Sequence, residues 1–141
     1  MRYFEVMYDY GKMPTRATSG SAGYDFYIPE KVILEPGETK MIKTGVRAYM
    51  EKNEVLLLYV RSSVGIKKKL VLANGTGVID SDYYGNISNG GEIGICLRNN
   101  SFEHVTIEAG ERIAQGIFIN YLTVDNDNTN TDRSGGFGST S

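Results

Sequence analysis

The residues of this chain best suited to chemistry stand together in the segment GVIDSDYYG, which runs from Gly77 to Gly85. Two carboxylates, Asp80 and Asp82, are followed at once by two phenols, Tyr83 and Tyr84. A carboxylate fixed beside an aromatic ring is what a general base needs next to a ring-shaped substrate. The same composition is typical of a structural turn, because Asp and Ser bond the local backbone and Gly accepts positive φ. From these residues alone, a catalytic hairpin and a plain turn both stay open.

A second candidate lies in the last part of the sequence. The segment from Asp125 to Thr131 contains no apolar residue, and RSGGFGSTS comes soon after it, with Arg133 at its head and Phe137 among glycines. Such a composition buries too little surface to offset its ordering entropy, so it predicts a mobile arm. Backbone N–H groups, hydroxyls and a guanidinium are also the donors that bind phosphates. An ordinary frayed terminus is the alternative interpretation.

The elements that must position these residues are predicted to be β-strands almost throughout. Apolar residues recur with the period of a strand, turn signals such as EPGE and EAGE separate the runs, and no long helical pattern competes. Val78 and Ile79 are expected to hold Asp80 at the rim of a sheet, and the run VLLLYV favours a strand buried on both faces. The predicted strands are 2–8, 31–34, 40–42, 45–50, 55–60, 70–72, 92–98, 105–107 and 113–122.

Many short strands at this spacing predict an all-β fold, with a jelly-roll-like β-barrel as the favoured architecture. The segment from Arg61 to Gly65 is predicted to form one helical turn, with Ser62 or Ser63 as its N-cap. The chain is therefore expected to divide into a β-barrel core, residues 1–124, and a flexible Gly-rich C-terminal arm, residues 125–141.

Composition limits the class of protein. With 141 residues, of which 40% are hydrophobic, the chain is long enough for one substantial core and too short for two ordinary domains. The net charge of −2 gives no footprint for nucleic acid, and the run from Lys67 to Lys69 is brief. The single cysteine, Cys96, excludes an internal disulfide and is expected to be a buried thiol. No signal peptide or membrane span is visible, so a cytoplasmic location is expected.

Five segments, taken in order, resemble the motifs of the trimeric dUTP pyrophosphatase (dUTPase) family. They are ATSGSAGYDF from Ala17 with TGV from Thr44, RSS from Arg61, ANGTGVIDSDYYG from Ala73, GERIAQ from Gly110 and RSGGFGST from Arg133. One such string can arise by chance, whereas five in order across nearly the whole chain hardly can. On this resemblance the sequence is identified as a member of the family.

The resemblance implies roles for the hairpin. Asp80 matches the catalytic carboxylate that activates a water for in-line attack on the α-phosphorus of dUTP, which gives dUMP and pyrophosphate. Tyr83 matches the ring that packs against the deoxyribose and leaves no room for a 2′-hydroxyl. Asn74, with the backbone of Gly77 and Val78, matches the element that reads uracil and excludes the thymine methyl group. A glycine at a point of close contact leaves room for the base.

The resemblance also implies the groups that hold the triphosphate. Asp25 matches the carboxylate that steadies Mg²⁺ through its water shell, which suits a cation that keeps its waters. The implied substrate-binding residues of the second and fourth motifs are Arg61, Ser62, Ser63 and Gln115. Those of the arm are Arg133, directed at the γ-phosphate, Phe137, stacked on uracil, and Gly138, Ser139 and Thr140, closing over the phosphates.

Members of this family are homotrimers with sites at the subunit interfaces. Motifs one, two and four are then expected from one chain, motif three from another and motif five from a third. The implied reaction keeps uracil out of DNA and supplies dUMP for dTMP synthesis. A regulatory protein partner, alongside catalysis or instead of it, stays open.

The chain departs from the commonest family pattern at several places. Ser63 stands where glycine is usual, and Tyr84 where arginine is frequent. Phe137 comes four residues after Arg133, where many members have five, so the register of the arm on the γ-phosphate is an open point. The segment from Asn86 to Gly91 is interpreted as a lengthened turn beside the site.

The dCTP deaminases share the fold and often the RSS motif, and they are the nearest enzymatic alternative. In them Asp-Pro-Gly-aromatic tends to stand at the third motif, followed by a catalytic Glu on the next strand. Here Ser81, Asp82 and Tyr83 follow Asp80, and Glu92 has no clear match to that glutamate. The dUTPase reading is therefore favoured, and release of ammonia from dCTP would overturn it.

Overall fold

The computed structural model describes residues 1–136, and within them nearly all regular structure is β-strand. The predicted all-β class is confirmed. The helices are α1 (Ser62–Lys67) and the 3₁₀ helix η1 (Ser81–Tyr83). The strands are β1 (Tyr3–Val6), β2 (Tyr24–Tyr27), β3 (Val32–Leu34), β4 (Thr39–Lys43), β5 (Val46–Tyr49), β6 (Glu54–Val60), β7 (Leu70–Leu72), β8 (Gly77–Asp80), β9 (Gly94–Asn99), β10 (Val105–Ile107) and β11 (Arg112–Asn120).

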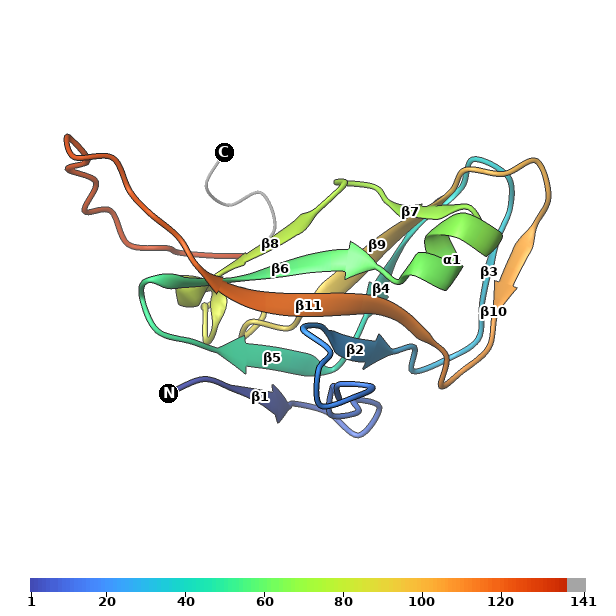
Figure 1. Cartoon of the computed structure of the whole chain (residues 1–141), viewed down its shortest axis with the longest axis horizontal. Helices are drawn as coiled ribbons and strands as arrows, with labels where there is room; N and C mark the ends of the chain where they lie inside the picture. Colours follow the sequence, from blue (N-terminus) through green and yellow to red (C-terminus); the bar gives the residue numbers. More distant parts are fainter. Residues whose placement is uncertain (137–141) are drawn as a thin grey trace.

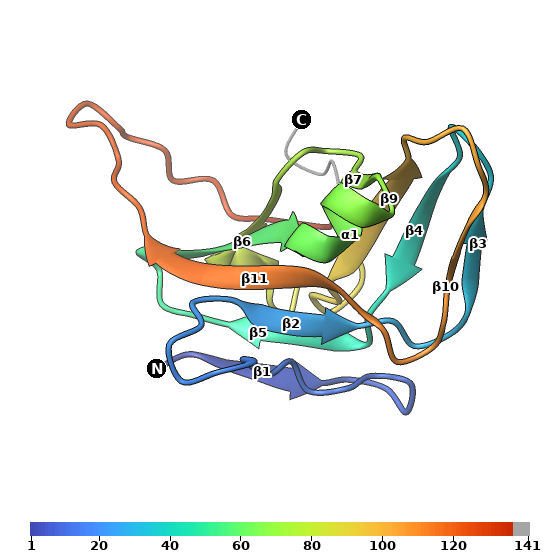
Figure 2. The same cartoon turned by 45° about the vertical axis from the view of Figure 1, so that its right-hand side comes forward.

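In residues 1–136 the strands form four antiparallel sheets. The largest has the order β2-β11-β6-β8, a second has the order β4-β9-β7, and β1-β5 and β10-β3 are two-stranded. Strands that are distant in sequence thus lie side by side, as in a jelly roll. Figures 1 and 2 show the sheets curving around a common interior, with β3 and β10 at one end and β1 and β5 along one side.

The interior is filled by aliphatic side chains from these sheets. Those with no exposed surface are Leu34, Leu56, Leu70, Ile93, Leu97, Ile107, Ile113 and Ala114. Strand β6, expected to be buried on both faces, buries Leu56 and Leu58, whereas Leu57 and Tyr59 are only half-buried. On the second face Val55 is buried, so the expectation was wrong only for Leu57 and Tyr59.

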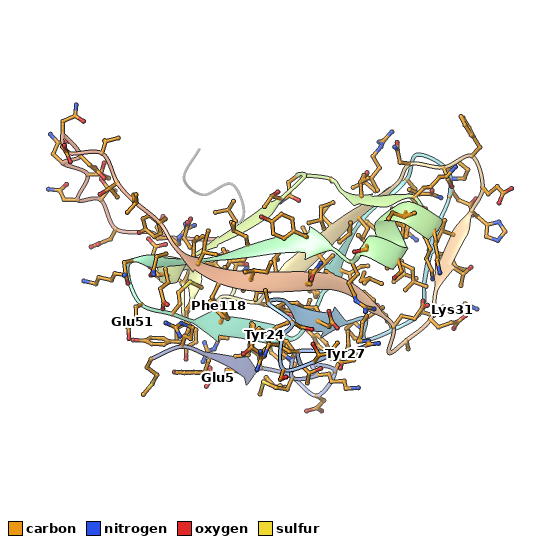
Figure 3. All side chains as sticks on the ribbon, in the orientation of Figure 1. Glu5, Tyr24, Tyr27, Lys31, Glu51 and Phe118 are labelled. Carbon is orange, nitrogen blue, oxygen red and sulfur yellow. The ribbon has the colours of Figure 1, made fainter. Side chains whose placement is uncertain are left out.

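An aromatic cluster joins β1 to the largest sheet. The ring of Phe4 lies 5.3 Å from those of Tyr24 and Phe118 and 5.6 Å from that of Phe26, measured between centroids. Tyr24 of β2 and Phe118 of β11 come together above β1 (Figure 3). Edge-to-face packing of this kind contributes beyond the buried area, so it helps to keep the edge strand in place.

Two local predictions differ from the structure. Strand β2 was not predicted, because a four-residue run that contains Asp25 carries little strand signal by itself; its pairing with β11 forms it. Helix α1 exists, but its N-cap is Arg61, without a side-chain capping bond. The N-cap prediction was wrong because the Arg61 N–H donates to the Ile113 carbonyl at 3.0 Å, which extends the sheet and starts the helix at Ser62.

After β11 the chain leaves the barrel as an extended arm. Figures 1 and 2 show it turning away from the sheets and then coming back to run beside β8. Residues 121–136 contain no strand or helix. None of the helices in the described part of the chain is long and apolar enough to cross a membrane.

An ion pair between Arg2 and Glu54 connects the N-terminus to β6, and it makes stability depend on pH. Arg2 Nε donates to Glu54 Oε2 at 2.7 Å, and this bond, followed by a bond from the Glu51 N–H, lowers the pKa of Glu54 below its usual value of 4.5. A carboxyl group whose pKa is lowered by folding stabilises the folded state at pH values above its unfolded pKa. This stabilisation is lost as the pH falls through the pKa in the folded state.

We expect Glu54→Gln to have a lower Tm than the wild type at pH 7, and the difference in Tm to disappear in acid. Glu103→Gln, in an exposed loop, is the control; a gap that persists at pH 3 would contradict this role.

Candidate active site

Strand β8 carries Asp80 on its outward face. It pairs antiparallel with β6, with Gly77 opposite Leu58 and Asp80 opposite Val55. Side chains alternate along a strand, so Ile79 is buried while the side chain of Asp80 is 53% exposed. The sequence-based expectation of a carboxylate held at the rim of a sheet matches this geometry.

Asp80 lies on a narrow cavity of about 170 Å³, here called the hairpin pocket. The third-motif residues predicted for the base, the sugar and the attacking water all contribute to it, and so does Arg133 of the arm. The lining residues are Leu58, Leu72, Asn74, Gly77, Val78, Ile79, Asp80, Tyr83, Gly94, Cys96, Arg133 and Gly136. Cys96 was expected to be buried in its strand, but it is half-buried and belongs to this wall.

Gly77 is required here for a different reason from the one expected. A Cβ at this position would lie 2.9 Å from Leu58 Cβ, on the core side of the strand, so the glycine lets β8 approach β6. Gly75 has φ of 74° in the turn before β8, with open space where a Cβ would be. The close approach is therefore to the core, and the turn sets the direction of the hairpin.

The ring of Tyr83 is held firmly at the end of η1. Its side chain is only 6% exposed, its hydroxyl donates to the Glu92 carbonyl at 2.5 Å, and Asn89 Nδ2 donates to that hydroxyl at 2.9 Å. Burial raises the pKa of Tyr83 above its usual value of 10. The ring is therefore a neutral, fixed surface of the pocket rather than an acid or base.

Arg133 connects the arm to the hairpin through two carboxylates. Its Nη2 donates to Asp80 Oδ2 at 2.7 Å, and its Nε donates to Asp82 Oδ1 at 2.7 Å. The bond to Asp82 raises the pKa of Arg133, whose side chain is 10% exposed. No partner was predicted for Asp82 from the sequence, and this contact was missed. The available signal was a pair of acidic residues two positions apart in the hairpin, together with one basic residue, Arg133, in an otherwise acidic arm.

A second cavity, of about 300 Å³, collects the residues of the other motifs and is here called the Asp25 pocket. Gln115 of β11 is paired in register with Asp25 of β2, and its side chain lies over Gly23, where a Cβ would come within 2.4 Å of Oε1. The lining residues are Ala17, Ser21, Gly23, Asp25, Arg61, Ser62, Ser63 and Gln115.

The Asp25 carboxylate is buried between two guanidinium groups. Arg61 Nε lies 3.3 Å from Oδ1, and Arg112 NH1 lies 3.4 Å from Oδ2. Two cations face one anion, so this part of the surface carries an excess positive charge next to the hydroxyls of Ser62 and Ser63. Such an arrangement suits a phosphate chain.

The described residues suit a magnesium ion that arrives with its ligand. Among residues 1–136 no three His, Cys, Asp or Glu side chains are grouped as a metal site. Mg²⁺ typically keeps several waters and uses one or two carboxylates together with substrate phosphates. The single carboxylate of Asp25, beside phosphate donors, fits contact through water.

The two pockets share no lining residue, so one chain does not bring all the predicted site residues together. The hairpin pocket unites the third motif with Arg133 of the fifth, and the Asp25 pocket unites the first, second and fourth. The remaining predicted arm residues, Phe137, Gly138, Ser139 and Thr140, lie outside the described residues.

The fold and these pockets define a jelly-roll-like β-barrel protein with two separate surface pockets, one lined by Asp80 and Tyr83 and the other by Asp25 and Arg61. The family model for dUTPase matches residues 9–141. The chain therefore belongs to the dUTPase family.

Named relatives agree with this assignment. The deoxyuridine 5′-triphosphate nucleotidohydrolase of Lactococcus lactis subsp. lactis (strain IL1403) is 48% identical over 146 residues, covering 99% of this chain and 97% of the relative. The crystal structure of the dUTPase from Streptococcus mutans superposes with a TM-score of 0.81 at 44% identity, covering 87% of this chain and 98% of the other.

Two phage enzymes resemble the chain at lower identity. A variant dUTPase of Staphylococcus bacteriophage 80alpha, with dUpNHpp, has a TM-score of 0.77 at 27% identity, over 95% of this chain and 99% of the other. Phage dUTPases of this kind are described as controlling the transfer of virulence genes. A variant dUTPase from phage phi11 of S. aureus, with a structural Mg(II) ion, has a TM-score of 0.77 at 26% identity over 95% and 99%.

The Arg133–Asp82 contact can be tested by proteolysis, because trypsin cleaves after arginine. We expect Asp82→Asn to speed trypsin cleavage after Arg133 several-fold in the ligand-free protein, since one of the two ion pairs that hold the side chain is lost. Raised salt should speed cleavage of the wild type in the same way by screening. Mass spectrometry of the released octapeptide gives the rate of cleavage. The matched control is Asp125→Asn, in the exposed part of the arm. Equal rates for the two variants would show that Asp82 does not hold Arg133.

Proposed function

We propose that this chain hydrolyses dUTP to dUMP and pyrophosphate, with Asp80 as the general base. Membership of the dUTPase family supports the reaction. The observation that carries the assignment of residues is the exposed Asp80 carboxylate on a cavity that is also lined by Asn74, by strand β8 and by the buried Tyr83. The proposed general base, the strand proposed to bind uracil and the aromatic ring proposed to contact the deoxyribose thus line one small cavity.

The uracil ring is proposed to bind against β8. This strand lies at the edge of its sheet, with β6 on one side only, so its outer edge offers backbone donors and acceptors in a row. An edge of this kind can pair with a planar amide-like ligand as it would with another strand. Asn74, in the turn before β8, adds a side-chain amide, and a methyl group on the base would have to fit against this backbone.

The deoxyribose is proposed to pack on Tyr83, where the fixed ring leaves no space for a 2′-hydroxyl. The water activated by Asp80 then lies between the carboxylate and the α-phosphorus. Asp80 takes a proton from this water as the water oxygen bonds to the α-phosphorus, and pyrophosphate leaves on the opposite side. Arg133 contacts the Oδ2 atom of Asp80, and a shift of its guanidinium toward the phosphates would free this oxygen to accept the proton.

Mg²⁺ is the proposed cofactor, supported by the fit of Asp25 and by the structural Mg(II) ion in the phi11 enzyme. When bound, the ion neutralises charge on the triphosphate. The residues of this chain do the rest on that side: Asp25 orients the water shell, while Ser62 and Gln115 donate to phosphate oxygens. Asp25 is itself held by Arg61 and Arg112, which fixes its direction.

A complete site is proposed to form between subunits of a homotrimer. The supporting observation is that the hairpin pocket and the Asp25 pocket of one chain share no residue. A dUTP molecule needs both, so the hairpin pocket of one subunit is proposed to face the Asp25 pocket of another. The barrel core, residues 1–124, then forms the trimer, and the arm, residues 125–141, closes over the ligand.

The two alternatives are a dCTP deaminase and a regulatory role with a protein partner. A deaminase would need its glutamate in the pocket, but the Glu92 carboxylate accepts bonds from the Tyr10 hydroxyl and, at 2.9 Å, from the Gly45 N–H, away from the lining of the hairpin pocket. A regulatory protein partner remains a prediction, supported only by the description of the phage enzymes.

Replacement of the Asp80 carboxylate tests the reaction directly. We expect Asp80→Asn to lower kcat for pyrophosphate release by about 10²- to 10⁴-fold, the usual contribution of a general base. Affinity for dUpNHpp, measured by calorimetry with Mg²⁺, should stay within a few-fold of wild type because the amide keeps the shape of the pocket. Asp9→Asn, on an exposed turn, is the control. Release of ammonia from dCTP, or equal turnover of dUTP by the wild type and Asp80→Asn, would contradict the proposal.

Mixed subunits test the shared site. Asp80→Ala chains and Asp25→Asn chains are each expected to be inactive, for different reasons. After subunit exchange, demonstrated by mass spectrometry, activity toward dUTP should return, since some sites combine the intact hairpin pocket of one chain with the intact Asp25 pocket of another. Exchange without any return of activity would show that both pockets of a site must come from one chain.

A further inference from the structure

The turn from Asn86 to Gly91, between η1 and β9, contains an amide whose bonds lead directly into the hairpin pocket. Asn89 Oδ1 accepts from the Gly91 N–H at 3.0 Å and from Asn86 Nδ2 at 2.8 Å. Its Nδ2 donates to the Tyr83 hydroxyl at 2.9 Å. The side chain therefore joins the turn to the ring that borders the pocket.

The orientation of this amide follows from its partners. A backbone N–H and an amide N–H both point at one atom of Asn89, and only oxygen can accept them. The nitrogen must then face Tyr83, whose own proton goes to the Glu92 carbonyl at 2.5 Å. The hydroxyl of Tyr83 thus accepts one bond and donates another, and the ring is held in a single direction.

The same nitrogen also borders the arm. A Cβ built on Gly136 would lie 2.9 Å from Asn89 Nδ2 and 3.4 Å from its Cγ, and Gly136 is buried. Normally the end of a side chain moves away from such a contact at little cost. Here it cannot do so without breaking its bond to Tyr83, so the fit of the arm and the position of the ring depend on one group.

We propose that Asn89 is a positioning residue that couples the arm to the sugar-contacting ring. It holds Tyr83 through the hydroxyl, and it forms the surface on which Gly136 docks. The inference rests on the proposed function and deepens it: discrimination against a 2′-hydroxyl is strongest when the arm is docked, because docking confines the amide that fixes the ring.

A purely structural role in the turn gives different expectations from a coupling role. If Asn89 only closes the turn, its loss lowers Tm, and its effects add to those of changes at Tyr83 and Gly136. If it couples the two, its loss lowers the preference for dUTP over UTP, and the effects are not additive. Ser88→Ala, an exposed neighbour in the same turn, is the matched control.

The experiment measures kcat/KM for dUTP and UTP, by pyrophosphate release with Mg²⁺. Asn89→Ala is expected to lower the dUTP/UTP ratio by about two- to tenfold, the effect of one hydrogen bond. In a Tyr83→Phe background the same change should have no further effect on the ratio, because the hydroxyl is already absent. Ser88→Ala should leave the ratio unchanged.

A second cycle examines the arm. Gly136→Ala should raise KM for dUTP in the wild-type background and do so far less with Asn89→Ala, where a small side chain leaves room for the new methyl group. An unchanged dUTP/UTP ratio in Asn89→Ala, or additive effects in both cycles, would overturn the inference while leaving wild-type turnover intact. Absence of pyrophosphate release by the wild type would instead refute the proposed function.

Discussion

The antiparallel pairing of β6 with β8 is the constraint on which the site depends. Leu56 and Leu58 of β6 are anchored in the core, and β8 comes close enough to pair with them because Gly77 has no side chain to meet Leu58. With that register set, the two-residue period of the strand sends Ile79 inward and Asp80 outward. A slip of one residue would bury the carboxylate and expose the isoleucine. The Asp80 carboxylate is thus placed by the burial of its apolar neighbours, before any ligand is present.

The charges around the hairpin and around Asp25 are arranged in opposite senses. At the hairpin two carboxylates, Asp80 and Asp82, hold one guanidinium, that of Arg133. In the other pocket two guanidiniums flank the one carboxylate of Asp25. The proposed triphosphate would therefore be attracted to the second region, and its charge would compete with the carboxylates for Arg133. Ion pairs that are partly exposed are modest in strength, so such an exchange of partners is inexpensive.

The part of the fold that could be predicted was the part controlled by local pattern. Most strands were found close to their observed bounds, since alternation and turn residues report directly on a half-buried sheet. Strand β2 was missed because pairing with β11 creates it, and the N-cap of α1 was misassigned because the Arg61 N–H bonds to Ile113 across the sheet. Leu57 and Tyr59 of β6 are less buried than expected, because burial depends on which neighbouring elements cover each face of the strand. The sequence of one strand does not contain that information.

For the site, the sequence by itself determined the chemistry: the carboxylate of Asp80 after an apolar strand, the adjacent phenol of Tyr83 and the family these motifs indicate. Residue types and their order suffice for that, because reactivity resides in functional groups. Only the tertiary structure decided which groups meet. It united Asp80, Asp82 and Arg133, although more than fifty positions separate the arm from the hairpin, and it tied Asn89 to Tyr83 and Gly136. It also kept the Asp25 pocket apart from the hairpin pocket. Such contacts arise from the crossing of strands and the path of the arm, and sequence spacing carries no direct record of either.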